Sequence, residues 1–276
     1  MARPEGEARV VLAEGREAEV YLEPDGSVLK LWRDPGDGER RQHELAALAA
    51  LGPTACRVPQ PLATVEVDGR PGLVLERVEG TDLLAALGRR PLAVLAAARA
   101  MARVHAAMHE GEAPAELPDL HALLARRIEQ AGALPPAWRD RSLDLLAGLP
   151  AGDRICHGDF HLGNMLGTWS DPVVIDWGDA CRGDPVADVA RSDLMIRLGE
   201  PPPGAPASLR LLAGVGRGIL VGRYLAGYRR RHPLDSDALD RWRTVRAAAR
   251  LCEDIPEERP RLFRLLRRQL GDPVSS

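Results

Sequence analysis

The first third of the chain alternates short apolar runs with turn residues. Three β-rich runs lie between Val10 and Trp32, reading RVVLAEG, EAEVYLEPDG and SVLKLW. The last two are separated by Pro24-Asp25-Gly26. A turn of this composition between two β-rich runs favours a hairpin. We therefore predict three short antiparallel strands at the start of the chain.

One helix and two further strands are expected next. The segment GERRQHELAALAALG places Leu45, Leu48 and Leu51 at nearly helical spacing, which predicts a helix. Two more β-rich runs follow, PLATVEVDG and GLVLERV, and the turn residues 68–72 join them. The pattern thus predicts about five strands and one helix.

After Glu79 and Gly80 the pattern becomes Leu- and Ala-rich and helical, as in PLAVLAAARAMARVHAAMHE. Helical patterns dominate to the end of the chain, with a loop-rich interruption at residues 151–185. The change places a lobe boundary near residues 76–80. We predict an α+β fold with a small antiparallel β lobe (residues 1–78) and a larger, mostly helical lobe (residues 79–276).

Composition is that of an ordinary globular protein. The 276 residues are enough for two lobes that share a cleft, and 45% hydrophobic residues with a net charge of -3 are typical of a soluble protein. The arginine-rich segments RYLAGYRRRH and RPRLFRLLRR lie in a chain whose net charge is negative, with acidic residues interleaved. We interpret them as solvated helix faces and expect no nucleic-acid partner.

Other patterns bear on location. The four cysteines lack the paired spacing of a zinc site or a small disulfide scaffold. The first residues lack a basic segment followed by an apolar run, and the most apolar helical stretch carries Arg217 and Arg223. We expect a cytoplasmic protein without membrane contact, as a monomer or a weak dimer.

The loop-rich segment carries the strongest chemical pattern. It reads ICHGDFHLGNMLGTWSDPVVIDWGDACRGDPVADVA, in which Asn164 follows Asp159 by five positions and the apolar run VVI ends at Asp176. Phosphoryl transfer needs a carboxylate that accepts a hydroxyl proton, and a carboxylate and an amide oxygen that bind magnesium. The spacing and the strand context favour a site of this kind over a chance match.

The distribution of lysine adds a second part of the site. Lys30 is the only lysine among 37 basic residues, and Asn164 is the only asparagine. A base-composition bias explains the scarcity but not these positions. Strand alternation places Val28, Lys30 and Trp32 on one face, so we expect Lys30 to point into the cleft beside Val20 and Val28. A lysine on such a strand can reach the phosphates of a nucleotide.

On these motifs the chain resembles the aminoglycoside phosphotransferase family, which shares the protein-kinase fold. HGDFHLGN matches the catalytic loop and IDWGD the metal-binding segment. The resemblance implies that Asp159 is the catalytic base, that Asn164 and Asp176 bind magnesium, and that Leu166 forms a floor under the nucleotide base. It also implies a structural role for His157, which would orient the loop.

The resemblance extends to the small lobe and to the scaffold. It implies that Glu44 is the ion-pair partner of Lys30, and that LVLERVEG is the interlobe hinge, where Glu76 and Val78 offer backbone groups to the base. Asp188 matches a buried aspartate that holds the catalytic loop. The turn expected to cover the phosphates, EGREAEVY, has Gly15 as its one glycine, unlike the multi-glycine loop of protein kinases.

The expected activity is transfer of the γ-phosphate of ATP or GTP, with Mg²⁺, to a hydroxyl of a small molecule. Aminoglycosides, choline, homoserine and sugars are all open as acceptors, and so is a role in antibiotic resistance. One alternative is a catalytically silent regulatory protein that binds nucleotides. The short stretch between Asp176 and Asp188 argues against a protein Ser/Thr kinase.

Several residues have two interpretations. Asp159 and Asp176 could be loop-capping aspartates, and Asp179 could approach metal or substrate or be a solvated loop carboxylate. His161 is assigned to loop packing, and His105 with His109 to helix packing rather than to a metal site. The acidic residues of CEDIPEE, either an acceptor site or an exposed helix end, are Glu253, Asp254, Glu257 and Glu258.

Overall fold

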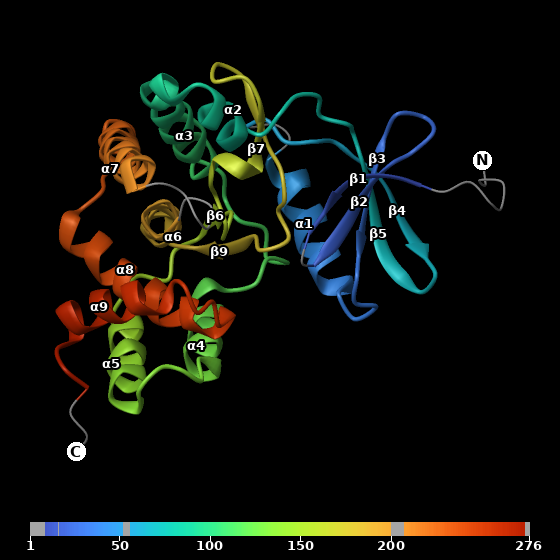
Figure 1. The fold of residues 1–276 in the computed structure, drawn as a ribbon. Coiled ribbons are helices and arrows are strands. Elements are labelled where there is room, and N and C mark those ends of the chain that lie inside the picture. Colours follow the sequence, from blue (N-terminus) through green and yellow to red (C-terminus); the bar gives the residue numbers. More distant parts are fainter. Residues whose placement is uncertain (1–8, 16, 52–55, 200–206, 274–276) are drawn as a thin grey trace.

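The small lobe is a five-stranded antiparallel sheet with one helix. The computed structural model describes residues 9–15, 17–51, 56–199 and 207–273, without the side chains of 207–213. The strands follow the order β1-β2-β3-β5-β4 across the sheet (Figure 1). The elements are β1 (Val10–Glu14), β2 (Ala18–Leu22), β3 (Val28–Trp32), α1 (Gly38–Leu51), β4 (Pro61–Val67) and β5 (Arg70–Leu75). The predicted fifth strand is shorter than expected, since β5 ends before Glu76.

The turn between β2 and β3 confirms the expected hairpin. Asp25 accepts hydrogen bonds from the backbone N–H and the hydroxyl of Ser27, at 2.9 and 2.6 Å. Gly26 adopts a positive φ of 85°, which a residue without a Cβ adopts readily. The hairpin pairs Leu22 with Val28 and Val20 with Lys30. This register places Val20 and Lys30 on the same face of the sheet.

Helix α1 packs against the sheet with a face slightly different from the predicted one. Its buried residues are Glu44, Ala47, Leu48 and Leu51, while Leu45 is half-buried. The spacing i, i+3, i+4, i+7 is that of one helical face. The small side chain of Ala47 therefore faces the core, and a carboxylate shares that face.

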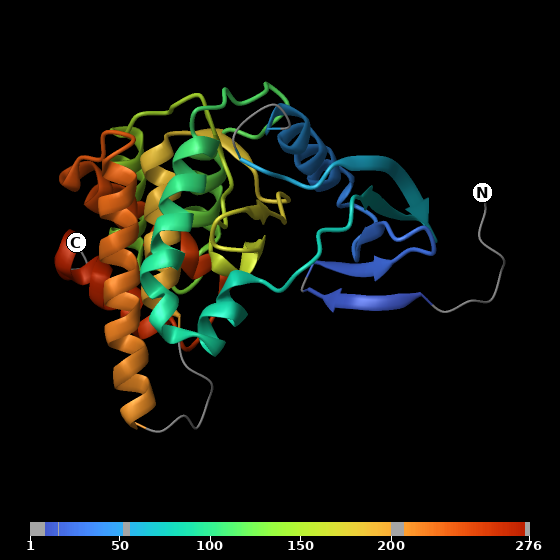
Figure 2. The ribbon, with the colours of Figure 1, turned by 90° about the horizontal axis from the view of Figure 1, so that it is seen from above.

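The larger lobe is mostly helical. Its elements are α2 (Leu83–Arg89), η1 (Pro91–Ala93), α3 (Val94–Met108), α4 (Leu120–Gln130), α5 (Pro136–Ala147), α6 (Pro185–Leu198), α7 (Ala207–Arg229), α8 (Ser236–Arg250), η3 (Leu251–Glu253) and α9 (Arg259–Leu270). Helices α3 and α7 run side by side, and α6 packs against α7 and α8 (Figure 2). Within the described residues, no helix combines the length and the apolar character that a membrane crossing requires.

Two short strand pairs bring the loop-rich segment together. They are β6 (Arg154–Cys156) with β9 (Cys181–Gly183), and β7 (Met165–Gly167) with β8 (Pro172–Val174), with the 3₁₀ turn η2 (Leu162–Asn164) before β7. The sequence pattern indicated only the VVI run as a strand here. Three-residue strands carry too little alternation to be recognised. The expected fold class, a β lobe followed by a helical lobe, is confirmed.

Candidate active site

Lys30 lies between two carboxylates of different lobes. Its Nζ donates to Glu44 Oε2 at 2.6 Å and to Asp176 Oδ1 at 2.7 Å. The ammonium also lies 5.1 Å from the ring centroid of Trp32, within the range of a cation–π contact. The structure thus confirms the pair of Lys30 and Glu44 that the resemblance implied, and brings Asp176 to the same ammonium.

Burial and charge set the protonation of this group. Burial alone would lower the pKa of Lys30, but Glu44 and Asp176 offset this, and its pKa is raised overall. Burial raises the pKa of Glu44, an effect that Lys30 partly offsets. Lys30 is the main cause that lowers the pKa of Asp176. A protonated lysine beside an ionised Asp176 is therefore the stable state at neutral pH.

Asp176 differs from Glu44 in its exposure. The Asp176 side chain is 57% exposed, whereas that of Glu44 is 1% exposed. Asp176 also adopts a positive φ of 66°, a conformation that is uncommon outside glycine and is often found at functional sites. Glu44 is therefore buried against Lys30 and the backbone of Trp177, while Asp176 presents a carboxylate to solvent.

The catalytic loop holds its own shape through hydrogen bonds. His157 is fully buried, and its Nδ1 accepts the backbone N–H of Asp159 at 3.3 Å. Its Nε2 lies 3.1 Å from the carbonyl oxygen of Ile175, to which it donates. The Asn164 side chain donates to the Asp159 carbonyl oxygen at 2.9 Å. His157 has the structural role that the resemblance implied.

Asp188 anchors this loop from the first turn of α6. Its two oxygens accept the backbone N–H groups of His157 and Gly158, at 2.7 and 3.0 Å. The same carboxylate lies 3.1 Å from His105 Nε2 and 3.4 Å from His109 Nε2. Four donors thus surround one buried carboxylate, and Asp188 holds the catalytic loop as the resemblance implied.

The group His105, His109 and Asp188 has ligand atoms close enough to hold a metal ion. However, the Nδ1 atoms of the two rings lie 2.6 and 2.7 Å from the hydroxyls of Tyr224 and Tyr228. Because a carboxylate only accepts hydrogen bonds, both Nε2 atoms are donors and the tyrosines donate to Nδ1. All four ring nitrogens are engaged, which agrees with helix packing.

Two residues lie next to Asp159 whose contacts with it were not predicted from the sequence. Arg191 Nη2 lies 3.1 Å from Asp159 Oδ1, and His161 Nε2 lies 3.4 Å from Oδ2. His161 also accepts the Gly163 backbone N–H at 3.0 Å, so its assignment to loop packing was incomplete. Burial would raise the pKa of Asp159, but His161 and Arg191 lower it overall. Asp159 is thus ionised at neutral pH.

A signal for Arg191 did exist. It follows Asp188 by three positions on α6, and residues at this spacing share a helical face. Since Asp188 was expected to hold the catalytic loop, the same face could have been searched for partners of Asp159. His161 offered no comparable signal.

Asn164 and Asp176 fit the requirements of a hard cation. The backbone N–H of Ile175 donates to the Asn164 carbonyl at 3.0 Å. Asn164 precedes β7 and Asp176 comes shortly after β8, so this bond holds the two residues near each other at one end of the β7–β8 pair. The Asn164 amide nitrogen is engaged by the loop, which leaves the amide oxygen as the ligating end. An amide oxygen and a carboxylate are oxygen donors of the kind that magnesium binds.

The residues expected around the nucleotide base come from both lobes. Val20 and Val28 are half-buried on β2 and β3, and Leu166 lies on β7, whose position between the lobes is visible in Figure 1. Glu76 and Val78 lie between β5 and α2. The backbone N–H of Glu76 donates to the Gln60 carbonyl at 2.9 Å, so this N–H is already engaged within the small lobe.

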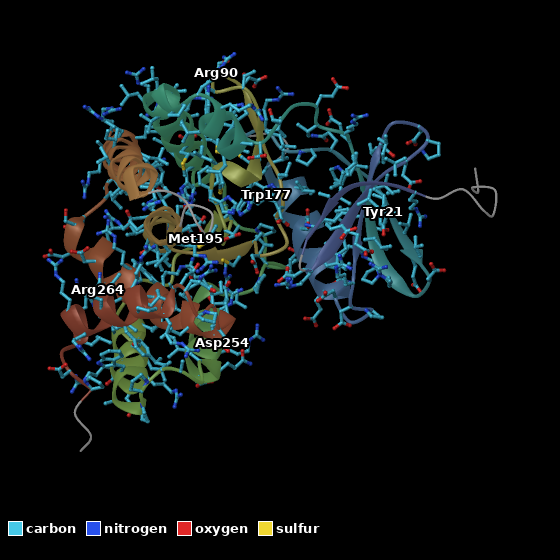
Figure 3. The ribbon with its side chains drawn as sticks, in the orientation of Figure 1. Tyr21, Arg90, Trp177, Met195, Asp254 and Arg264 are labelled. Atoms are coloured by element: carbon cyan, nitrogen blue, oxygen red, sulfur yellow. The ribbon has the colours of Figure 1, made fainter. Side chains whose placement is uncertain are left out.

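The acidic segment after α8 is paired with arginines of this chain. Glu253 lies 3.2 Å from Arg191 and also pairs with Arg250. Glu258 forms two hydrogen bonds with Arg250, at 2.7 and 2.9 Å. Asp254, labelled in Figure 3, pairs with Arg259, and Glu257 is exposed. The segment therefore lies near Asp159 through Arg191, but most of its negative charge is already neutralised.

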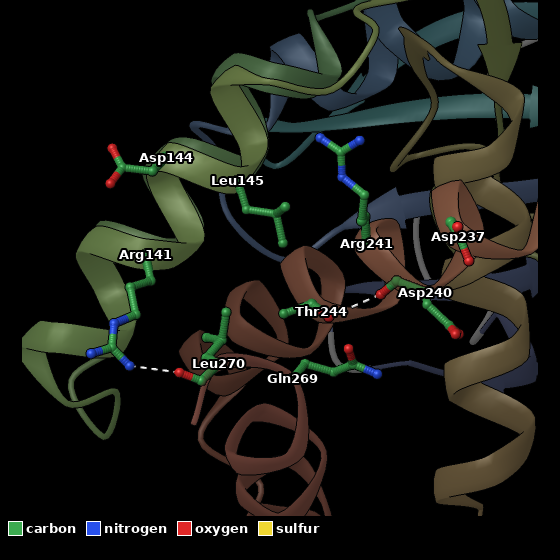
Figure 4. Close-up of a pocket in the computed structure, with 9 residues that line it drawn as sticks. All are labelled: Arg141, Asp144, Leu145, Asp237, Asp240, Arg241, Thr244, Gln269 and Leu270. Atoms are coloured by element: carbon green, nitrogen blue, oxygen red, sulfur yellow. Dashed lines mark hydrogen bonds between the residues drawn. The ribbon is translucent and has the colours of Figure 1, made fainter. Parts of the chain in front are cut away.

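A hollow of about 660 Å³ lies between α5, α8 and α9. Figure 4 shows its mixed lining of acidic and basic side chains, in which Arg141 donates to the Leu270 carbonyl. It contains none of the residues of the candidate active site. Arg141 and Arg241 donate to backbone carbonyls, and Asp240 pairs with Arg243. We assign it no role in the chemistry.

This chain is similar to known proteins in sequence and in fold. Residues 9–217 match the phosphotransferase enzyme family. A search of curated proteins gave no match.

Solved structures share the fold. Amicoumacin kinase hAmiN, in complex with AMP-PNP, Ca²⁺ and Ami, superposes with a TM-score of 0.66 at 17% identity, covering 98% of this chain and 89% of that one. The apo form of a thermostable aminoglycoside phosphotransferase APH(4)-Ia mutant gives 0.63 at 17% identity, with 96% of both chains covered. The GDP complex of aminoglycoside 2'-phosphotransferase-IIIa gives 0.59 at 20% identity, covering 96% and 93%. The family match spans most of the sequence, and this chain belongs to the phosphotransferase enzyme family.

Proposed function

We propose that this protein transfers the γ-phosphoryl group of ATP or GTP to a hydroxyl of a small molecule. The observation that carries the proposal is the position of Lys30 Nζ, 2.6 Å from Glu44 and 2.7 Å from Asp176. An oriented ammonium beside an exposed carboxylate is what the phosphates of a nucleotide require. Solved relatives in fold bind AMP-PNP and GDP, which supports a nucleotide donor.

Asp159 would act on the acceptor. Its ionised carboxylate would accept the proton of the acceptor hydroxyl, whose oxygen forms the new bond to the γ-phosphorus. The bond from that phosphorus to the β–γ bridging oxygen breaks, and the nucleoside diphosphate carries the negative charge away. Lys30 stays protonated throughout and stabilises charge on the phosphates.

Magnesium, when bound, would neutralise the phosphate oxygens. Asn164 and Asp176 would hold it, through the amide oxygen and the exposed carboxylate. Glu44 is excluded as a ligand because it is buried against Lys30. The chain's own contribution is the fixed placement of these groups.

The test is nucleotide consumption with ATP and GTP across a panel of aminoglycosides, amino alcohols such as choline and homoserine, and sugars. We expect at least one acceptor to stimulate turnover. Asp159→Asn should lower kcat with that acceptor by about 10²–10⁴, the usual contribution of a general base, and should leave nucleotide affinity nearly unchanged. Nucleotide binding with no stimulation by any acceptor would instead support the silent regulatory protein.

A further inference from the structure

Asp179 connects the two lobes through one carboxylate oxygen. It lines a hollow of about 580 Å³ between α1 and α4. Its Oδ1 accepts from Arg40 Nη2 at 3.2 Å and from Arg127 Nη2 at 3.1 Å. Arg40 belongs to α1 of the small lobe, and Arg127 to α4 of the larger lobe. The carboxylate is therefore shared between arginines of opposite lobes.

The small-lobe arm of this contact leads to the candidate active site. Arg40 precedes Glu44 by one helical turn, so both lie on one side of α1. Arg40 also forms an ion pair with Glu17, in the turn between β1 and β2. Through this single arginine, Asp179 is connected to the helix that carries the partner of Lys30 and to the turn expected to cover the phosphates.

The segment from Asp176 to Asp179 lies between Lys30 and the catalytic loop. A Cβ built on Gly178 would lie 3.7 Å from Glu44 Oε2 and 3.9 Å from Lys30 Nζ. A Cβ on Gly158 would lie only 2.3 Å from the carbonyl oxygen of Asp179. The segment is thus packed tightly against the catalytic loop, and a displacement of α1 relative to the larger lobe would disturb it at Gly178, beside Glu44, and at Asp179, beside Arg40.

From these contacts we propose that Asp179 is a positioning residue for nucleotide binding. It fastens α1 to α4 and so keeps Glu44 and Lys30 aligned with Asp176. The inference rests on the proposed function, because it assumes that the cleft binds a nucleotide. It assigns a role to a carboxylate for which the sequence left two interpretations open, and that role acts through α1 rather than through contact with the nucleotide.

The strength of the contact is moderate. The side chains of Arg40, Arg127 and Asp179 are 26%, 27% and 30% exposed, so solvent screens them in part. Burial would lower the pKa of Arg127, but Asp179 is the foremost group that raises it. Screening by added salt should weaken the connection.

The experiment measures the Kd of ATP with Mg²⁺ by calorimetry, without any acceptor. Asp179→Asn should raise this Kd about three- to fivefold at low salt, as expected for partly exposed ion pairs, and the difference should shrink at high salt. Arg40→Gln and Arg127→Gln should each reproduce the effect. The pair Arg127→Gln and Asp179→Asn together should be little worse than either change alone.

Asp272→Asn is the matched control, because it removes an exposed ion pair with Arg267 at the end of α9, and its Kd should equal that of the wild type. The inference is overturned if Asp179→Asn binds nucleotide as the wild type does, or if Arg127→Gln has no effect while Arg40→Gln does. A rise only in the KM of an acceptor would also overturn it. A wild-type protein that binds no nucleotide would overturn the proposed function itself, which is a distinguishable result.

Discussion

The carboxylate of Asp188 accepts the backbone N–H of His157 at 2.7 Å, so the first turn of α6 determines where the catalytic loop begins. Both groups are fully buried. An asparagine at position 188 offers one accepting oxygen in place of two, which leaves some of the four surrounding donors without an acceptor.

We predict that Asp188→Asn lowers the free energy of unfolding by about 2–4 kcal/mol, since buried donors without partners are costly. Urea denaturation measures this. Asp235→Asn is the control, because Asp235 is the N-cap of α8 and asparagine caps helices equally well. Equal stability of the two variants would contradict the assigned role of Asp188.

The buried histidine beside Asp188 predicts a pH dependence of stability. Burial, with a contribution from His109, lowers the pKa of His105 to about 3, although Asp188 opposes this. In the unfolded chain a histidine has a pKa near ~6.5. The folded state thus binds fewer protons, so the stabilisation is complete above that unfolded pKa and is lost as the pH falls toward 3.

Between about pH 6 and 4, we expect the wild type to lose about 1 kcal/mol per pH unit more than His105→Gln does. Denaturant titrations across this range measure the difference. The pKa of His43 is also lowered by burial, but His43 is present in both proteins and its effect cancels. Parallel curves for the two proteins would show that His105 is not held neutral.

The ion pair between Lys30 and Glu44 predicts an effect on donor binding. Glu44→Gln keeps the size of the side chain but removes the buried negative charge, so Lys30 loses one of the two carboxylates that orient it. We expect the KM for the nucleotide to rise about tenfold, the size of a charge-assisted hydrogen bond. Steady-state kinetics check this, with the exposed Glu39→Gln on the same helix as the control. An equal change in both variants would contradict the specific role of Glu44.

The contact between Arg191 and Asp159 predicts a shift in the pH profile. Arg191 and His161 lower the pKa of Asp159, which keeps it ionised in acid. Without the arginine, that pKa should rise toward the ordinary value near ~4, and the acidic limb of kcat/KM should move to higher pH. Arg191→Gln should show this shift, and Arg191→Lys, which keeps the charge, should show less. If the acidic limb of kcat/KM lies at the same pH in Arg191→Gln as in the wild type, Arg191 does not lower the pKa of Asp159.

Local pattern was sufficient for most of the fold, and it singled out the central residues of the candidate site. The hairpin turn placed β2 and β3, strand alternation placed Lys30 on the cleft side with Val20 and Val28, and the spacing in the loop segment identified Asp159, Asn164 and Asp176. These features depend on residues that are near in sequence. The partner of Lys30 came from the family resemblance.

The features that were missed depend on contacts between distant segments. Arg191 meets Asp159 because α6 is anchored to the loop of residues 157–164, and Asp179 meets Arg127 because α4 packs near the segment of residues 176–179. In the backbone ladder of β6 and β9, Cys156 lies opposite Cys181, and each of these strands has three residues. No local periodicity encodes such pairings, which arise only when the chain is packed.

The burial of Lys30 has a practical consequence for chemical labelling. Because it is the only lysine, every other basic side chain apart from the histidines is a guanidinium. Its side chain is 11% exposed, and its ammonium is held protonated between two carboxylates. Among the side chains, reagents that acylate or cross-link primary amines thus have one target, Lys30, and a nucleotide bound beside it should slow its labelling.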